Sequence, residues 1–280
     1  MTPPIWKSFV AVGDSFTEGM CDPEPEPAQR YAGWADRLAG HLSARAAAAG
    51  AEFRYANLAV RGRKLGDIVG PQLDAALAMA PELVSIVGGG NDILRPTVDL
   101  AALAQRLEDA VVRARTAGAD VLLATPSDTV HSGLFKPLRP RHAIHTANLF
   151  TIAARHGAHV VNLWQMRSIQ DWRMWADDRI HLTSAGHERV ALAALESLGF
   201  ETNREEWLTP LPPATPRART QQLAEHVRWG RTHFTPWLGR RLNKRSSGEV
   251  ILAKRPQLEP LAPAPILPLL SLPYQPVPQP

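Results

Sequence analysis

The chain has 280 residues, of which 45% are hydrophobic and 21% charged, a balance that suits a folded core and excludes a wholly disordered protein. No stretch approaches the roughly 18 consecutive apolar residues that a membrane-spanning helix needs, and no long apolar run precedes Gly13. The single cysteine, Cys21, cannot form an internal disulfide or build a cysteine-based metal site alone. We therefore expect a cytoplasmic protein that is neither secreted nor membrane-spanning.

The net charge of +4 is unevenly distributed along the chain. Residues 217–255 contain ten Lys and Arg residues against two Glu residues, whereas acidic side chains outnumber basic ones over residues 1–216. The basic character therefore belongs to a C-terminal segment and not to the body of the protein.

Short β-rich runs alternate with stretches of helical period over the first 200 residues, which predicts an α/β fold with a five-stranded parallel sheet covered by helices on both faces. The predicted strands are Ser8–Val12, Arg54–Leu58, Leu83–Val87, Asp120–Ala124 and His159–Leu163. The predicted helices are Gly33–Ala48, Leu65–Met79, Val98–Ala117, Arg141–Arg155 and Ser184–Leu198. Glycines stand where helix C-caps belong, at Gly50, Gly118, Gly157 and Gly199.

The pattern changes beyond Phe200. A cluster of prolines predicts a linker, and it is followed by a predicted helix at about Thr220–Trp229 and a basic stretch. Nine prolines in residues 256–280 favour extended, polyproline-like structure over a packed element. We therefore expect a main domain over residues 1–203, a basic helical extension over 204–254 and a Pro-rich, disordered tail over 255–280.

The first predicted strand ends in Gly13-Asp14-Ser15, which puts the Ser15 hydroxyl on the turn where a nucleophile would sit. A serine needs a base within hydrogen-bond reach and a third group to orient that base. Asp178 and His181 offer both partners on one short loop ahead of the last predicted helix. We expect Ser15 to attack, His181 to carry its proton, and Asp178 to orient the imidazole.

Acyl transfer also needs hydrogen-bond donors where the oxyanion develops. Gly62, after the second strand, can bring its backbone N–H close to a substrate, and the Asn91 amide follows the third strand in the sequence GGGND. With the Ser15 N–H, these residues give three candidate donors.

Four motifs stand in the order and spacing of the four sequence blocks of SGNH, or GDSL, hydrolases: GDSFTEG, the lone Gly62, GGND and DRIH. Residues 8 to about 199 therefore resemble that family. The resemblance implies a flavodoxin-like three-layer α/β/α fold, a Ser15–His181–Asp178 triad and an oxyanion hole of Ser15, Gly62 and Asn91. It also implies esterase, lipase or thioesterase activity with no metal and no cofactor. Basic residues flank Gly62, and they would either favour an anionic acyl substrate or be solvated.

Other conspicuous residues have simpler interpretations. We expect Asp177 at the surface, His187 in packing or capping, and no metal site at His142 and His145. The loop of residues 20–31 either walls the entrance or is an exposed connection. Five large apolar residues would line an acyl pocket or, in the favoured interpretation, pack in the core: Trp164, Met166, Trp172, Met174 and Trp175.

These observations predict a serine esterase that acts on a small acyl ester or thioester through a covalent acyl-enzyme. Two alternatives stay open: an acyltransferase with the same triad, and a catalytically silent binding protein that uses the basic extension. That extension would contact an anionic membrane or, in the interpretation we favour, dock on the body with its charges solvated, since Pro236 interrupts its amphipathic pattern. No recognised DNA-binding motif is present, so no specific nucleic acid is expected. Substrate-binding residues and oligomeric state are not predicted.

Overall fold

A computed structural model describes residues 3–22, 32–214, 220, 227–235, 248 and 251–263. The first half of the chain forms β1 (Ser8–Gly13), α1 (Ser15–Glu18), α2 (Gly33–Ala48), β2 (Arg54–Asn57), α3 (Leu65–Asp67), α4 (Leu73–Ala78), β3 (Leu83–Val87), α5 (Gly90–Ile93), α6 (Leu100–Thr116) and β4 (Asp120–Ala124). The second half adds α7 (Arg139–His156), β5 (His159–Val161), α8 (Ser184–Ser197), α9 (Arg204–Leu208) and β6 (Arg255–Pro260). No helix in this part of the chain is long and apolar enough to cross a membrane.

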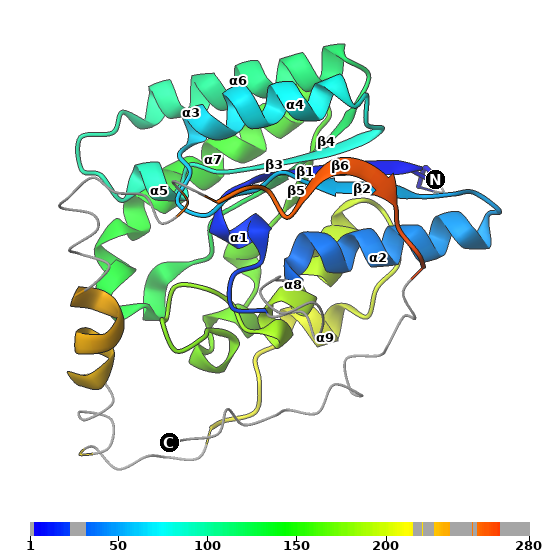
Figure 1. The fold of residues 1–280 in the computed structure, drawn as a ribbon. Coiled ribbons are helices and arrows are strands. Elements are labelled where there is room, and N and C mark those ends of the chain that lie inside the picture. The colour runs from blue at the N-terminus through cyan, green and yellow to red at the C-terminus, as the bar shows by residue number, and fades with distance from the viewer. Residues whose placement is uncertain are drawn as a thin grey trace.

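Six strands form one sheet in the order β5-β4-β3-β1-β2-β6, and Figure 1 shows it between two layers of helices. The first five strands run parallel in the doubly wound order 2-1-3-4-5, which confirms the predicted fold class. Their carboxyl ends share one edge of the sheet, where β1 delivers Ser15. All five predicted strands are present, with ends within two residues of prediction.

Alternating residues of the strands feed two separate cores. Phe9 and Ala11 of β1 face α2 and α8, whereas Val10 and Val12 face α3, α4, α6 and α7. Figure 1 shows these two sets of helices on opposite faces of the sheet. Burial on both faces explains why the strands are nearly continuous apolar runs.

The helix predicted over Leu65–Met79 is broken into two. Gly70 has non-helical backbone angles and is followed by Pro71, so α3 and α4 are joined by an irregular π-type turn over Ile68–Gln72. Proline lacks the amide proton for a regular helical bond and clashes with the preceding turn, which accounts for the break.

The expectation of an unpacked tail from residue 255 onward is wrong for Arg255–Pro260, which form β6. This strand pairs antiparallel with β2, so the sheet has six strands and not the predicted five. Its prolines are tolerated because β6 is an edge strand, where a missing amide proton can face solvent. The end of β6 is fixed because the Leu261 N–H donates to Phe53 O at 2.9 Å and Ser43 Oγ donates to Leu261 O at 2.7 Å.

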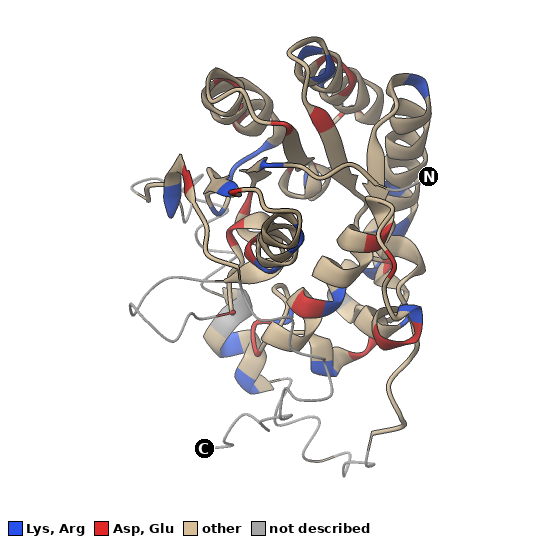
Figure 2. Ribbon diagram, turned by 90° about the vertical axis from the view of Figure 1, so that its right-hand side faces the viewer, with Lys and Arg blue, Asp and Glu red and all other residues tan. Residues whose placement is uncertain are grey.

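The structure shows no break in the core at the predicted boundary of residue 203. Trp207, in α9, is buried in the same hydrophobic cluster as α2 and α8. Most of the predicted helix at 220–229, the basic stretch 237–247 and residues 264–280 lie outside the described residues, so the membrane interpretation of that stretch stays untested. Over the described elements, Lys and Arg residues are interspersed with Asp and Glu residues (Figure 2).

Candidate active site

The turn after β1 holds Ser15 at the first position of α1. Asp14 caps this short helix, since its Oδ1 accepts the Phe16 N–H at 3.1 Å. No side chain fits at Gly13, because a Cβ there would lie 2.4 Å from Thr17 Oγ1 and 2.9 Å from Val87 O. These contacts explain why a glycine and an aspartate must precede the serine.

Gln72 fixes the turn from the neighbouring helical segment. Its Oε1 accepts the Gly13 N–H at 2.9 Å, and its Nε2 donates to the Gly13 carbonyl at 3.1 Å. Sequence reasoning missed this residue, because a lone glutamine 59 positions away carries no motif.

The loop before α8 holds His181 against Asp178. The imidazole Nδ1 lies 2.6 Å from Asp178 Oδ2, and Asp178 Oδ1 accepts the backbone N–H groups of Ile180 at 2.9 Å and His181 at 3.0 Å. Burial raises the pKa of Asp178, but these hydrogen bonds and the charge of His181 outweigh it and hold the pKa at about 2. Asp178 is therefore an anion that orients the ring.

The loop is closed by its own backbone. The Ala176 N–H donates to His181 O and the Arg179 N–H to Ala176 O, each at 2.8 Å. Arg179 adopts a left-handed conformation, with φ of 58°, which the tight turn requires. Asp177 is exposed, as expected.

Asn91, in α5, connects the turn of Ser15 to the loop of Gly62. Its Nδ2 donates to Asp14 Oδ2 at 3.2 Å and to the Arg63 carbonyl at 2.9 Å, so the turn of Ser15, the loop of Gly62 and the helix α5 meet at this amide. Gly62 adopts a left-handed conformation, with φ of 74°. Within the described residues, the backbone N–H groups of Ser15 and Gly62 donate no hydrogen bond, so both are available to an oxyanion.

The structure does not join Ser15 to His181 by a hydrogen bond. It places them at the same edge of the sheet: Cys21, six residues after Ser15, contacts Asp178, and the charge of His181 lowers the pKa of Asp14 against the larger effect of burial. The hydrogen bond between a catalytic nucleophile and its base is often long before substrate binds.

The interpretation of the basic residues around Gly62 as a site for an anionic substrate is not supported for Arg61. Arg61 binds Glu18, which is buried in α1, through its backbone N–H at 2.7 Å and its Nε at 3.0 Å. Its charge is therefore neutralised inside the protein, so Arg61 does not offer an anionic substrate a free guanidinium. The same pair ties the loop of Gly62 to the helix that begins at Ser15.

His187 has the packing role expected from the sequence. His187 Nδ1 accepts the Trp34 N–H at 3.2 Å and its Nε2 lies 3.3 Å from Met20 O, while burial lowers its pKa to about 4. Met166 and Met174 are buried in the core as expected, whereas the core prediction is wrong for Trp172, which is 54% exposed. His142 and His145 are buried in α7 and belong to no cluster of metal-ligating groups in the described residues.

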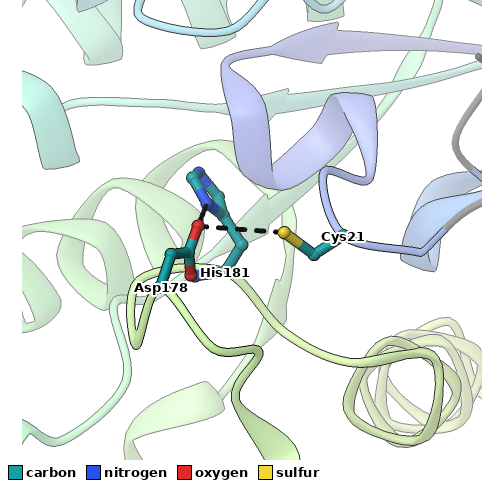
Figure 3. A group of neighbouring side chains, drawn as sticks. All are labelled: Cys21, Asp178 and His181. Atoms are coloured by element: carbon teal, nitrogen blue, oxygen red, sulfur yellow. Dashed lines mark hydrogen bonds and ion pairs between the residues drawn. The ribbon is translucent and has the colours of Figure 1, made fainter. Parts of the chain in front are cut away.

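Cys21 is a neighbour of the dyad that the sequence did not indicate. Its Sγ lies 3.8 Å from Asp178 Oδ2, the oxygen that also accepts from His181 (Figure 3). Burial and the negative charge of Asp178 raise the pKa of this thiol to about 12.

Comparison with known proteins agrees with this arrangement. A model of the GDSL-like lipase/acylhydrolase family matches residues 11–189. The chain belongs to this family. It is accordingly an ester-hydrolysing serine hydrolase, and the family match spans all four motifs.

Several solved structures have a similar fold. A protein named TesA is 27% identical with a TM-score of 0.53, over 69% of this chain and 98% of its own. Axe2, an acetylxylan esterase from Geobacillus stearothermophilus, is 22% identical with a TM-score of 0.57, over 70% of this chain and 95% of its own. LAE5, an alpha/beta hydrolase from the metagenome of Lake Arreo, Spain, is 24% identical with a TM-score of 0.58, over 69% and 95%. No curated protein matches the chain.

Proposed function

We propose that this hydrolase cleaves small acyl esters or thioesters through a covalent acyl-enzyme on Ser15. His181 is the general base and acid, and Asp178 orients it. The backbone N–H groups of Ser15 and Gly62 form the oxyanion hole, and the side-chain amide of Asn91 joins them by exchanging its 3.2 Å hydrogen bond to Asp14 Oδ2 for one to the oxyanion.

The observation that carries the proposal is the 2.6 Å contact between His181 Nδ1 and Asp178 Oδ2. A proton on Nδ1 leaves the lone pair on Nε2, which is the tautomer that can take a proton from a serine. Catalytic mutants of Axe2 that replace a serine and a histidine support the assignment of these two residue types.

In the first half-reaction, Ser15 Oγ attacks the acyl carbon while its proton passes to His181 Nε2. The imidazolium then returns that proton to the leaving group, the ester bond breaks, and an alcohol or thiol departs from acyl-Ser15. In the second, water attacks the acyl carbon, gives a proton to the same imidazole, and releases a carboxylic acid as Ser15 recovers its hydrogen.

A panel of p-nitrophenyl esters from acetyl to dodecanoyl tests the proposal. We expect Ser15→Ala and His181→Ala each to lower kcat by about 10³-fold or more. Ser197→Ala is a matched control, because Ser197 ends α8 beside the start of β5, at the opposite edge of the sheet. A wild-type enzyme inert on the whole panel would favour a silent binding protein.

The covalent step has its own measurement. A fluorophosphonate probe should add its phosphonyl mass to the peptide that contains Ser15 in the wild type and not in Ser15→Ala. An alcohol added as acceptor distinguishes the acyltransferase: transesterified product in excess of free acid would show that the acyl-enzyme passes its acyl group to alcohols in preference to water.

A further inference from the structure

Three side chains of the kinds that bind zinc converge beside the acid/base loop. Cys21 Sγ, Asp178 Oδ2 and His181 Nδ1 come from segments about 160 residues apart in sequence, and one ligand atom from each lies within 4.8 Å of the others. Figure 3 shows the sulfur and the imidazole directed at the same carboxylate, from either side. Among the described residues this is the one group of three such side chains.

We propose that Cys21, Asp178 and His181 form an inhibitory site for Zn²⁺, and that the bound ion switches the hydrolase off. The inhibition rests on the proposed role of His181 as the base, whereas the binding does not.

The distances suit one tetrahedral ion. Zinc binds thiolate sulfur at about 2.3 Å, and imidazole nitrogen and carboxylate oxygen at about 2.0–2.2 Å, so two ligand atoms on one ion are separated by about 3.2–3.7 Å. The Cys21 Sγ to Asp178 Oδ2 distance of 3.8 Å is already close to this range. The 2.6 Å between Asp178 and His181 has to widen by about 0.6 Å as the ion replaces the shared proton.

The ligand types and the exposure both favour zinc. Thiolate and imidazole select a borderline-soft ion such as Zn²⁺ over Mg²⁺ or Ca²⁺, which prefer oxygen ligands. The Asp178 and His181 side chains are 18% and 15% exposed, so the site is open enough to receive an ion from solution. Three protein ligands leave a fourth position for water.

The changes in protonation that accompany zinc binding explain why the ion would inhibit ester hydrolysis. Zn²⁺ takes the lone pair at His181 Nδ1, so the proton of the neutral ring must sit on Nε2, exchanging through solvent. An Nε2–H can donate a hydrogen bond to Ser15 but cannot accept its proton. The Cys21 thiol releases one proton to solvent as its sulfur binds the ion, so the site changes from Asp⁻, SH and neutral imidazole to a neutral zinc complex plus H⁺. The enzyme then has no base to take the proton of Ser15.

The inhibition experiment uses the full chain, stripped of metal with a chelator and returned to metal-buffered solution. We expect free Zn²⁺ to inhibit ester hydrolysis, excess chelator to reverse the inhibition, and Mg²⁺ and Ca²⁺ at the same concentrations to have no effect. Cys21→Ser should weaken the inhibition by about tenfold or more, with each variant compared with its own metal-free rate. His156→Gln is the matched control, since it removes the surface pair of His156 and Glu108, which could bind zinc weakly.

A spectroscopic readout tests the site without activity. Co²⁺ bound to a thiolate gives a sulfur-to-metal charge-transfer absorption, which we expect in the wild type and in Ser15→Ala, and not in Cys21→Ser. Absorption without any esterase activity would leave the metal site standing and overturn the proposed function. Equal zinc inhibition of Cys21→Ser and wild type, or a cobalt complex without the sulfur band, would overturn the metal site.

Discussion

The indole Nε1–H of Trp229 donates a hydrogen bond to the backbone carbonyl of Asp178 at 3.0 Å. The guanidinium of Arg179, the next residue, lies 5.0 Å from the centre of the same indole ring. Trp229 therefore holds the turn that carries Asp178 and His181 from a helical segment more than 45 residues further along the chain. Part of the predicted extension is thus a support of the acid/base loop.

Trp229→Phe tests this support, because phenylalanine keeps a ring over Arg179 but removes the N–H donor. Loss of one hydrogen bond of about 1 kcal/mol should lower kcat roughly fivefold with little change in KM, since the imidazole is less well oriented and Trp229 is not among the groups proposed to contact substrate. Trp229→Ala should lower kcat further. Steady-state kinetics measures both, with Trp172→Phe, at an indole that is 54% exposed, as the control expected to stay within twofold of wild type. Equal kcat in Trp229→Ala and wild type would contradict this role.

Lys254 joins β6 to the start of the active site. Its Nζ lies 2.6 Å from Asp36 Oδ2 and donates to the carbonyl of Glu18, the last residue of α1, at 2.6 Å. Lys254→Met would remove the nearest cation from the Asp36 carboxylate, whose side chain is 11% exposed, and leave Arg255 Nε 3.9 Å from it, so we expect a loss of about 2 kcal/mol in the free energy of unfolding. Urea unfolding measures it. Glu52→Gln, which removes an exposed pair with Arg54, should cost at most about 0.5 kcal/mol.

The double variant Lys254→Met with Asp36→Asn decides whether the cost comes from the carboxylate that has lost its lysine. We expect it to be more stable than Lys254→Met alone, because the charge that Lys254 had neutralised is gone. Additive losses from the two single variants would show that the pair contributes nothing.

The parallel sheet could be predicted because its strands are buried on both faces. Runs such as Leu83–Val87 are apolar throughout, and the helices between them end at glycines with left-handed conformations, such as Gly50 and Gly118. The dyad could be predicted as well, since Asp178 and His181 are three residues apart and meet within one turn. In both cases the signal is local: a run, a cap or a short spacing.

Contacts between distant residues left no such signal. Three contacts join residues that are 51 to 218 positions apart: Gln72 with Gly13, Lys254 with Asp36, and Trp229 with Asp178. They are made by residue types that are common on surfaces. Likewise, β6 was hidden because Pro256 and Pro260 look like breakers until the strand is known to lie at an edge. Only the folded chain shows which lone side chains meet.

Asp14 should make stability depend on pH between 3.8 and about 6. Burial raises its pKa to about 6 from the usual 3.8, and the Phe16 N–H and the charge of His181 oppose this only in part. The folded state therefore binds the proton more tightly than the unfolded state does. The resulting stability is fully present below pH 3.8 and is lost as pH rises through about 6, by up to about 3 kcal/mol.

Asp14→Asn should remove this dependence, because asparagine still caps α1 but does not titrate. The measurement is urea unfolding of both proteins between about pH 3 and about pH 7, which spans the interval from 3.8 to about 6. Asp99→Asn is the matched control: Asp99 also caps a helix, α6, and lies near the surface, so this variant should follow the wild-type curve. If the free energy of unfolding changed with pH by the same amount in wild type and Asp14→Asn, the titrating group would be another residue.

Gly248 packs against the loop of Gly62 so closely that a methyl group should disturb the oxyanion hole. An added Cβ would lie 2.2 Å from the Arg61 carbonyl oxygen and 2.8 Å from Val60 Cγ1. The Arg61 carbonyl and the Gly62 N–H belong to one planar peptide unit, so a displacement of the oxygen rotates the N–H with it. Gly248→Ala should therefore lower kcat about tenfold or more, and by at most the roughly 10²–10³-fold that loss of an oxyanion donor causes.

Gly66→Ala is the control for this substitution, because nothing lies within 4 Å of a Cβ at Gly66 in α3. Both variants are assayed well below their unfolding temperatures, so that a loss of kcat in Gly248→Ala reports the site and not the folded fraction. An unchanged kcat in Gly248→Ala would mean that the chain around residue 248 moves in place of the Arg61–Gly62 peptide. The Gly62 N–H would then keep its direction whatever the C-terminal segment does.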